Sequence, residues 1–158
     1  MMTGALCAEV RVVPTPQYLE TLNDSIRVPD GGAVGIVPGP ASSLSSPKMK
    51  LAASFLEDSL RRISTSTKVM IADQKSAGVA IHLWNWAVDP NPPVPLNLLD
   101  RQTLSDPNHW GQSYIIRAPD AASLWAIGSS DQGVLLAAMT ILQTIRHTSA
   151  GTEIPRLY

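Results

Sequence analysis

The fold of this chain is decided by the stretch Asp131–Ile145, which reads DQGVLLAAMTILQTI. Either Ser130 or Asp131 can cap a helix at its start, and the carboxylate of Asp131 suits the positive end of the helix dipole. The pattern predicts a helix that runs to about His147. Its surface is apolar almost all round, interrupted only by Thr140, Gln143 and Thr144.

A helix that is apolar on every side is normally buried on every side. In a single domain of one sheet and two helices, however, the helical layer has one face in water. The surplus of apolar side chains on Asp131–Ile145 therefore predicts that something outside the domain covers this helix.

A second helix is predicted earlier in the chain, with a cap at Ser45 or Ser46 and Pro47 at its first position. Apolar residues recur at helical spacing from Met49 to Ile63, and charged residues fill the opposite side. This pattern is typical of a helix with one buried face and one solvent face.

The remaining elements are short strands separated by turns. The turn Pro29-Asp30-Gly31-Gly32 predicts a hairpin between the strands on either side of it. Asp89–His109 breaks every pattern and contains five prolines, so it is predicted as a loop. The helices do not alternate regularly with the strands, and we therefore expect an α+β fold: a mainly antiparallel sheet with two helices packed on one face. Strands are predicted at residues 9–13, 25–28, 33–37, 68–71, 78–84, 113–117 and 124–127.

The composition excludes several classes of protein. The chain has 158 residues, the length of one domain, and its 12 Lys and Arg against 13 Asp and Glu leave a net charge of −1. This balance gives no electrostatic footprint for nucleic acid or anionic lipid. Apolar residues make up 44%, which excludes a disordered chain. The longest apolar stretch, Val134–Leu142, is far shorter than the ~20 residues that span a bilayer, so neither nucleic acid nor a membrane is an expected partner.

The ionisable residues predict neither catalysis nor metal binding. The lone cysteine, Cys7, permits no internal disulfide and no cysteine-based metal site. Glu57 and Asp58 are the only adjacent acidic pair, and neighbours on a helix diverge by about 100°, so they cannot flank one substrate atom. Asp106 and His109 are too few for a zinc site, and the glycines of residues 30–39 lack the pattern of a phosphate-binding loop. We expect no metal and no cofactor.

The tryptophans leave two interpretations open. Trp84 and Trp86 share a strand face with His82, and Trp110 ends the long loop. Exposed indole rings can stack on sugars, which would make the three a platform for a glycan. Large aromatic side chains more often serve packing, and here they would cover the loop or the edge of the sheet.

The chain contains, in this order, the fragments Val12–Gln17, Gln112–Arg117, Leu124–Gly128, Ser130–Leu135, Thr140–Gln143 and Ile154-Pro155. Together they resemble the small domain that precedes the catalytic barrel in family 20 glycoside hydrolases, the β-hexosaminidases. Related domains occur in family 84 hexosaminidases and in α-glucuronidases. The resemblance covers roughly residues 10–158. The chain departs from the family at Leu136-Ala137-Ala138, where Tyr-Gly is common, and in the length of its proline-rich loop.

The resemblance implies a non-catalytic N-terminal domain that braces a catalytic barrel of the same polypeptide. In such a protein the two helices lie between the sheet and the barrel, the catalytic carboxyls belong to the barrel, and this chain alone is inactive. The barrel would follow Tyr158, and a secreted, periplasmic or cell-surface location would be expected, although residues 1–8 contain no signal peptide. The candidate barrel contacts are Leu135, Leu136, Met139 and Leu142.

These expectations define one domain and two alternatives. Residues 9–158 form a single α+β domain, cut before a barrel, and residues 1–8 are disordered or derive from cloning. The first alternative is a stand-alone carbohydrate-binding module that uses Trp84, Trp86 and Trp110. The second is a small enzyme of another type, which requires a concave pocket with convergent polar groups.

Overall fold

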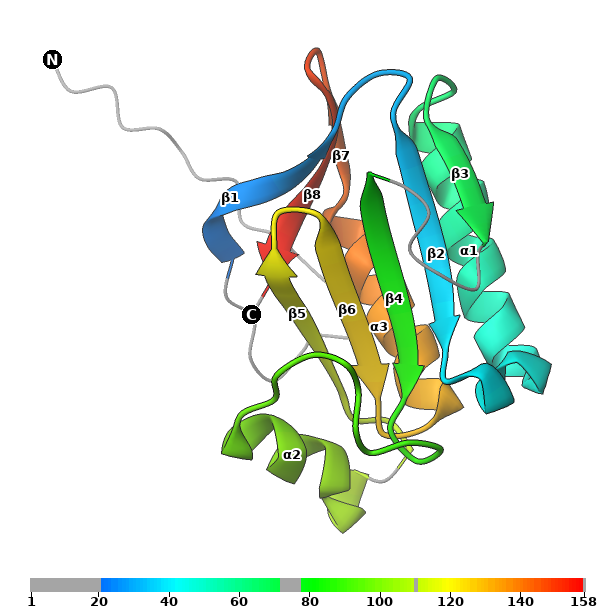
Figure 1. The fold of residues 1–158 in the computed structure, drawn as a ribbon, viewed down its shortest axis with the longest axis vertical. Helices are drawn as coiled ribbons and strands as arrows, with labels where there is room; N and C mark the ends of the chain where they lie inside the picture. The colour runs from blue at the N-terminus through cyan, green and yellow to red at the C-terminus, as the bar shows by residue number, and fades with distance from the viewer. Residues whose placement is uncertain (1–20, 72–77, 110, 158) are drawn as a thin grey trace, which may run out of the picture.

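The computed structural model describes residues 21–71, 78–109 and 111–157 (Figure 1). The strand predicted at residues 9–13, the expectation for residues 1–8, and Trp110 lie outside this part of the chain. The elements, in order, are β1 (Thr21–Val28), β2 (Ala33–Gly39), the 3-10 turn η1 (Ala41–Ser45), α1 (Pro47–Ile63), β3 (Lys68–Ile71), β4 (Val79–Asn85), α2 (Leu98–Ser105), η2 (Pro107–His109), β5 (Tyr114–Asp120), β6 (Ser123–Gly128), α3 (Asp131–Thr144), β7 (Arg146–Thr148) and β8 (Gly151–Leu157).

The strands form two sheets. The larger has the order β3-β2-β4-β6-β5 and the smaller the order β1-β8-β7. The smaller sheet is antiparallel throughout, as is the β5/β6 pair of the larger one. The other pairings of the larger sheet are parallel: β2 with β3, β2 with β4, and β4 with β6. The α+β class is confirmed, while the strand directions of the larger sheet differ from the antiparallel expectation because α1 and the long segment after β4 act as crossover connections.

The predicted hairpin between the first two described strands is wrong. The turn itself forms, since Gly32 N–H donates to Pro29 O at 2.8 Å and Gly31 has a φ of 75°. After the turn, however, β2 enters the larger sheet between β3 and β4, whereas β1 pairs with β8. A turn signal fixes the local reversal of the chain, and the neighbours of a strand are decided by the whole sheet.

Both predicted helices are confirmed, with one correction. The hydroxyl of Ser46 caps α1 by accepting from Met49 N–H, and Pro47 stands at the first turn. Ser130 caps α3, leaving Asp131 inside the first turn. α3 ends at Thr144 and does not reach His147, because Arg146–Thr148 is drawn into β7, the partner of β8.

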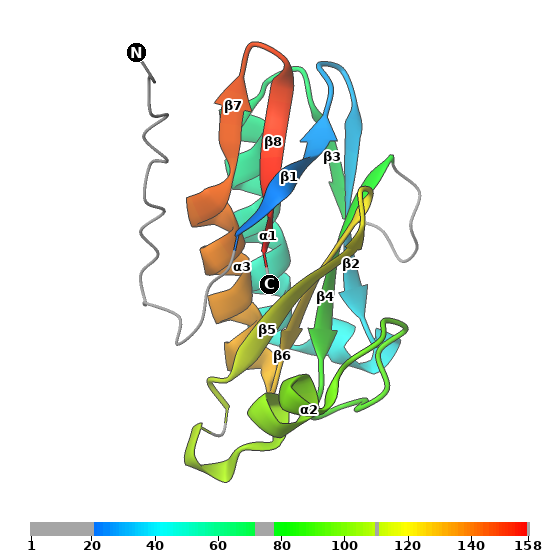
Figure 2. The same ribbon diagram turned by 90° about the vertical axis from the view of Figure 1, so that its left-hand side faces the viewer.

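α1 and α3 pack side by side on one face of the larger sheet (Figure 2). The core between them and the sheet is aliphatic, and β1 and β8 close it at one end. Its fully buried large side chains are Ile26, Ile36, Met49, Leu56, Leu60, Ile81, Leu83, Leu124, Ile141 and Ile154.

The opposite face of the sheet is partly covered by the segment that was predicted as a loop. That segment contains the short helix α2, which the prolines around it concealed. A capping box starts the helix: Asn97 Oδ1 accepts from Asp100 N–H at 2.8 Å, and Asp100 Oδ2 accepts from Asn97 N–H at 3.1 Å. A second, smaller core lies here, formed by Val94, Leu104, Ile115, Trp125 and Ile127.

Candidate interface on the helical layer

The start of α3 is pressed against the end of β6. A Cβ on Gly128 would lie 2.1 Å from the backbone nitrogen of Val134, and one on Gly133 would lie 2.4 Å from Ser113 O. Real Cβ atoms do not approach backbone this closely, so both positions require glycine. The helix therefore leaves the sheet in a fixed direction.

Asp131 ties α3 to the rest of the sheet and to α1. One carboxylate oxygen accepts from Ser46 Oγ, the cap of α1, and the other accepts from Asn85 Nδ2 at the end of β4. Because one side chain bridges the starts of both helices, the two are held in register with each other. On the other flank of α3, the Tyr114 hydroxyl and Thr140 Oγ1 lie 2.8 Å apart and fix the rotation of the helix about its axis.

These anchors turn one side of α3 away from the sheet. Leu135, Met139 and Leu142 follow one another at spacings of four and three residues and form one stripe, with Leu136 beside Met139. Met139 is 37% exposed and the three leucines are partly buried. All four candidate barrel contacts thus retain accessible apolar surface, and their role as contacts stays a prediction.

α1 contributes two further apolar residues that were not predicted as candidates. Leu51 is 44% exposed and Phe55 is 43% exposed, and their spacing of four residues places them on the same side of the helix. In the sequence the two lie among charged residues, so the pattern assigns this side of the helix to solvent. We call the set Leu51, Phe55, Leu135, Leu136, Met139 and Leu142 the helical-layer surface.

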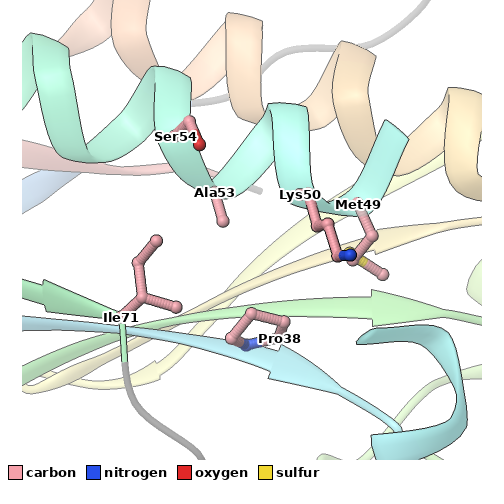
Figure 3. Close-up of a pocket in the computed structure, with 6 residues that line it drawn as sticks. All are labelled: Pro38, Met49, Lys50, Ala53, Ser54 and Ile71. Atoms are coloured by element: carbon pink, nitrogen blue, oxygen red, sulfur yellow. The ribbon is translucent and has the colours of Figure 1, made fainter. Parts of the chain in front are cut away.

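A shallow cavity of about 360 Å³ lies at the edge of the helical layer, between α1 and the ends of β2 and β3. Figure 3 shows Pro38 and Ile71 pointing toward α1, and Met49 and Ala53 facing them from the helix. Ser54 and Lys50 complete the lining, so Lys50 is its one ionisable residue. This apolar lining offers no convergent set of polar groups.

A second cavity, of about 430 Å³, separates the start of α2 from the end of β5. Asp100 and Arg117 line it, and they form an ion pair whose side chains are 3% and 13% exposed. Asp100 accepts through both oxygens, from Arg117 Nε and Nη2. This bidentate pair connects α2 to β5.

Two of the three tryptophans of the predicted glycan platform, Trp84 and Trp86, pack against the second core, and Trp110 lies outside the described residues. Trp84 is partly buried and donates through Nε1 to Asp89 O at 2.8 Å. Trp86, just after β4, is also partly buried, with the Arg101 guanidinium 5.8 Å from its ring centroid. The sequence reasoning missed Trp125, which stacks on His82 with ring centroids 4.0 Å apart. Glycan binding here stays a prediction that titration with oligosaccharides, followed by tryptophan fluorescence, would test.

The remaining candidate residues lie in two separate places, Glu57 and Asp58 on α1, and Asp106 and His109 at η2. Glu57 pairs with Arg61 at 2.6 Å, whereas Asp58 is exposed on the same helix. Asp106 and His109 lie in and beside η2, where Asp106 accepts from Asn108 N–H. In residues 21–71, 78–109 and 111–157 no group of three or more His, Cys, Asp or Glu could hold a metal ion. Among the described helices, none is long and apolar enough to cross a membrane.

Comparison of the sequence with protein families and with curated proteins finds no match. The fold, in contrast, matches solved structures. A GH20 exo-β-N-acetylglucosaminidase from Vibrio harveyi superposes with a TM-score of 0.55 at 17% identity over 92% of this chain. The chitobiase of Flavobacterium johnsoniae gives 0.55 at 14% identity over 92%, and the N-acetyl-β-hexosaminidase of Streptomyces plicatus gives 0.53 at 14% over 93%.

The chain has the fold of a part of family 20 glycoside hydrolases. It spans 18%, 20% and 26% of the lengths of these three family 20 proteins. The resemblance in the sequence is thereby confirmed at the level of fold, over a part of each of these proteins.

Proposed function

We propose that this chain is the non-catalytic accessory domain of a larger glycoside hydrolase, and that its helical-layer surface packs against a catalytic barrel of the same polypeptide. The observation that carries the proposal is the apolar surface on both helices. Leu51, Phe55 and Met139 are each more than one-third exposed, and they lie on two helices that Asp131 holds in register. Exposed apolar side chains gathered on one layer of a domain favour a site of interaction.

The partial coverage of the family 20 structures supports the same conclusion, because about three-quarters or more of each neighbour lies outside the match. A glycosidase needs two carboxyls about 5–9.5 Å apart across the scissile bond. In this chain the adjacent acidic pair is divided, since Glu57 is bound to Arg61 and Asp58 is turned to solvent. This pair therefore offers no such arrangement, and we infer that the domain acts by bracing the barrel.

The test uses the protein encoded by the native gene, read through beyond Tyr158. Met139→Glu should lower the temperature at which hydrolysis of an aryl N-acetyl-β-hexosaminide is lost, because a charge at the interface weakens domain packing. Leu98→Glu is the matched control, since Leu98 is 72% exposed on α2, away from the helical layer. Equal effects of the two substitutions would contradict the proposal, as would a stop codon directly after Tyr158.

A further inference from the structure

The two edges of the larger sheet carry arginine side chains bonded to strand carbonyls. At the β3 edge, Lys68 N–H donates to Gly32 O of the segment entering β2 at 2.9 Å. Backbone groups of successive residues in a strand point to opposite sides, so the carbonyl of Val69 faces away from β2. Arg61 Nη2 reaches from α1 and donates to Val69 O at 3.2 Å, while Glu57 holds the same nitrogen at 2.6 Å.

The β5 edge shows the same arrangement twice. Ser129 N–H donates to Ser113 O at 2.8 Å, which places Ile115 and Arg117 in bonding positions toward β6 and turns Ile116 to the outer side. Arg117 Nη1 donates to Ile116 O at 3.0 Å. Next along the strand, Arg156 Nη2 reaches from β8 and donates to Ala118 O at 2.7 Å.

A proline lies in β2 beyond the last residue that pairs with β3. β2 is paired with β3 only as far as Ile36, which is opposite Ile71, and continues on its other side with β4. Pro38 is two residues beyond Ile36, so its backbone nitrogen faces the β3 side of β2, and that nitrogen carries no hydrogen. An added strand would find no donor at this position.

We propose that Arg61, Arg117 and Arg156 close the edges of the larger sheet against strand addition, and that the partner they exclude is a second copy of this chain. Unpaired edge carbonyls are templates for pairing with another strand, and here each guanidinium occupies one of them. The β5 edge is also sheltered by contacts with α2 and β8. At the β3 edge Met70 and Ile71 are 38% and 47% exposed, and among the described residues Arg61 is the arginine that occupies a carbonyl there.

A second copy fits this edge by symmetry. Two β3 strands placed edge to edge about a twofold axis would pair antiparallel, each supplying the same carbonyls and N–H groups to the other. Met70 and Ile71 lie on opposite faces of β3, and each would lose exposed apolar surface to the neighbouring strand of the second copy. Removing the Arg61 guanidinium frees Val69 O to accept a hydrogen bond from the partner strand.

The test compares Arg61→Gln with Arg62→Gln in the whole chain. Arg62 is the next residue of α1, is exposed, and forms no ion pair with the residues that the structure describes, so the control loses the same charge without opening the edge. In sedimentation over a concentration series, the average mass of Arg61→Gln should rise toward twice that of the monomer, while Arg62→Gln follows the parent. Hydrogen exchange should show new protection of the Val69 and Ile71 amides in Arg61→Gln alone.

A further variant distinguishes pairing through the β3 edge from non-specific association. Ile71→Lys, added to Arg61→Gln, places a charge on the opened edge and should return the protein to a monomer. The proposal is overturned if Arg61→Gln sediments like the parent at every concentration. It is also overturned if Arg61→Gln associates without protection of Val69 and Ile71, or if the parent itself dimerises with these amides protected.

Discussion

The two faces of the larger sheet are closed in different ways. On the helix side, Ile81, Leu83 and Leu124 are fully buried in an aliphatic core against α1 and α3. The opposite side contains individual directional contacts. His82 stacks on Trp125 with an interplanar angle of 7°, and Asp100 forms an ion pair with Arg117. Burial is spread over many side chains on the first face and concentrated in a few contacts on the second.

The two faces of the larger sheet are therefore stabilised by different kinds of interaction. The aliphatic side stabilises the fold because many apolar side chains are buried there together. The helices that cover it also carry exposed apolar side chains on their outer side. On the aromatic side α2 adds Leu104 to the second core, and it also makes a capping box and one ion pair, whose contributions can be measured one at a time. Substitutions on the two faces should therefore differ in size and kind.

The largest effect is expected from Arg117→Met. The substitution leaves the Asp100 carboxylate without its guanidinium partner at a site where its side chain is 3% exposed. Breaking one half of a buried pair costs about 3–5 kcal/mol, which urea unfolding monitored by circular dichroism would measure. Arg101→Met is the control: Arg101 is exposed and lies over Trp86, so the loss should be about 1 kcal/mol or less. Equal losses would show that α2 is held by apolar packing instead.

A pair of neighbours on β4 compares the two faces within one strand. Leu83 points into the aliphatic core and is 0% exposed, so Leu83→Ala should lower the free energy of unfolding by about 2–5 kcal/mol. Trp84 points to the other face, and Trp84→Phe removes its hydrogen bond to Asp89 O while keeping an aromatic ring. That loss should be near 1 kcal/mol. If Trp84→Phe were as costly as Leu83→Ala in the same unfolding measurement, the contrast between the faces would fail.

Local chemistry made part of the fold predictable. Ser46 and Pro47 mark the start of α1 because a cap and a first-turn proline act within a few residues. The capping box of Asn97 and Asp100 was an equally local signal for α2, hidden among prolines. Pairing of β1 with β8 was beyond this reasoning, because it joins Val28 to Thr152 across most of the chain.

The candidate interface was predictable on one helix and not on the other. On α3 the apolar surplus stands out, since nearly every side of the helix is apolar and only part of it can face the sheet. On α1 the same kind of surface consists of Leu51 and Phe55 among charged residues. Because most residues on that side are charged, the sequence pattern predicts a polar face and does not single out these two. Trp125 was missed because its partner His82 belongs to a neighbouring strand in space, distant along the chain.

The smallest effect is expected on the helical-layer surface itself. Met139 is 37% exposed, and its outer side faces solvent. Met139→Ser should therefore change the unfolding free energy of this chain by no more than about 0.5 kcal/mol. Ala138→Ser, one position along α3 but 0% exposed, is the matched control, because its hydroxyl would enter the aliphatic core. Its loss should be clearly larger in the same urea titration. Since removal of exposed apolar area also favours solubility, Met139→Ser should remain monomeric to higher concentration than the parent. A loss at Met139 as large as that at Ala138 would mean that the outer side of α3 belongs to the core of this domain and is not a surface kept for a partner.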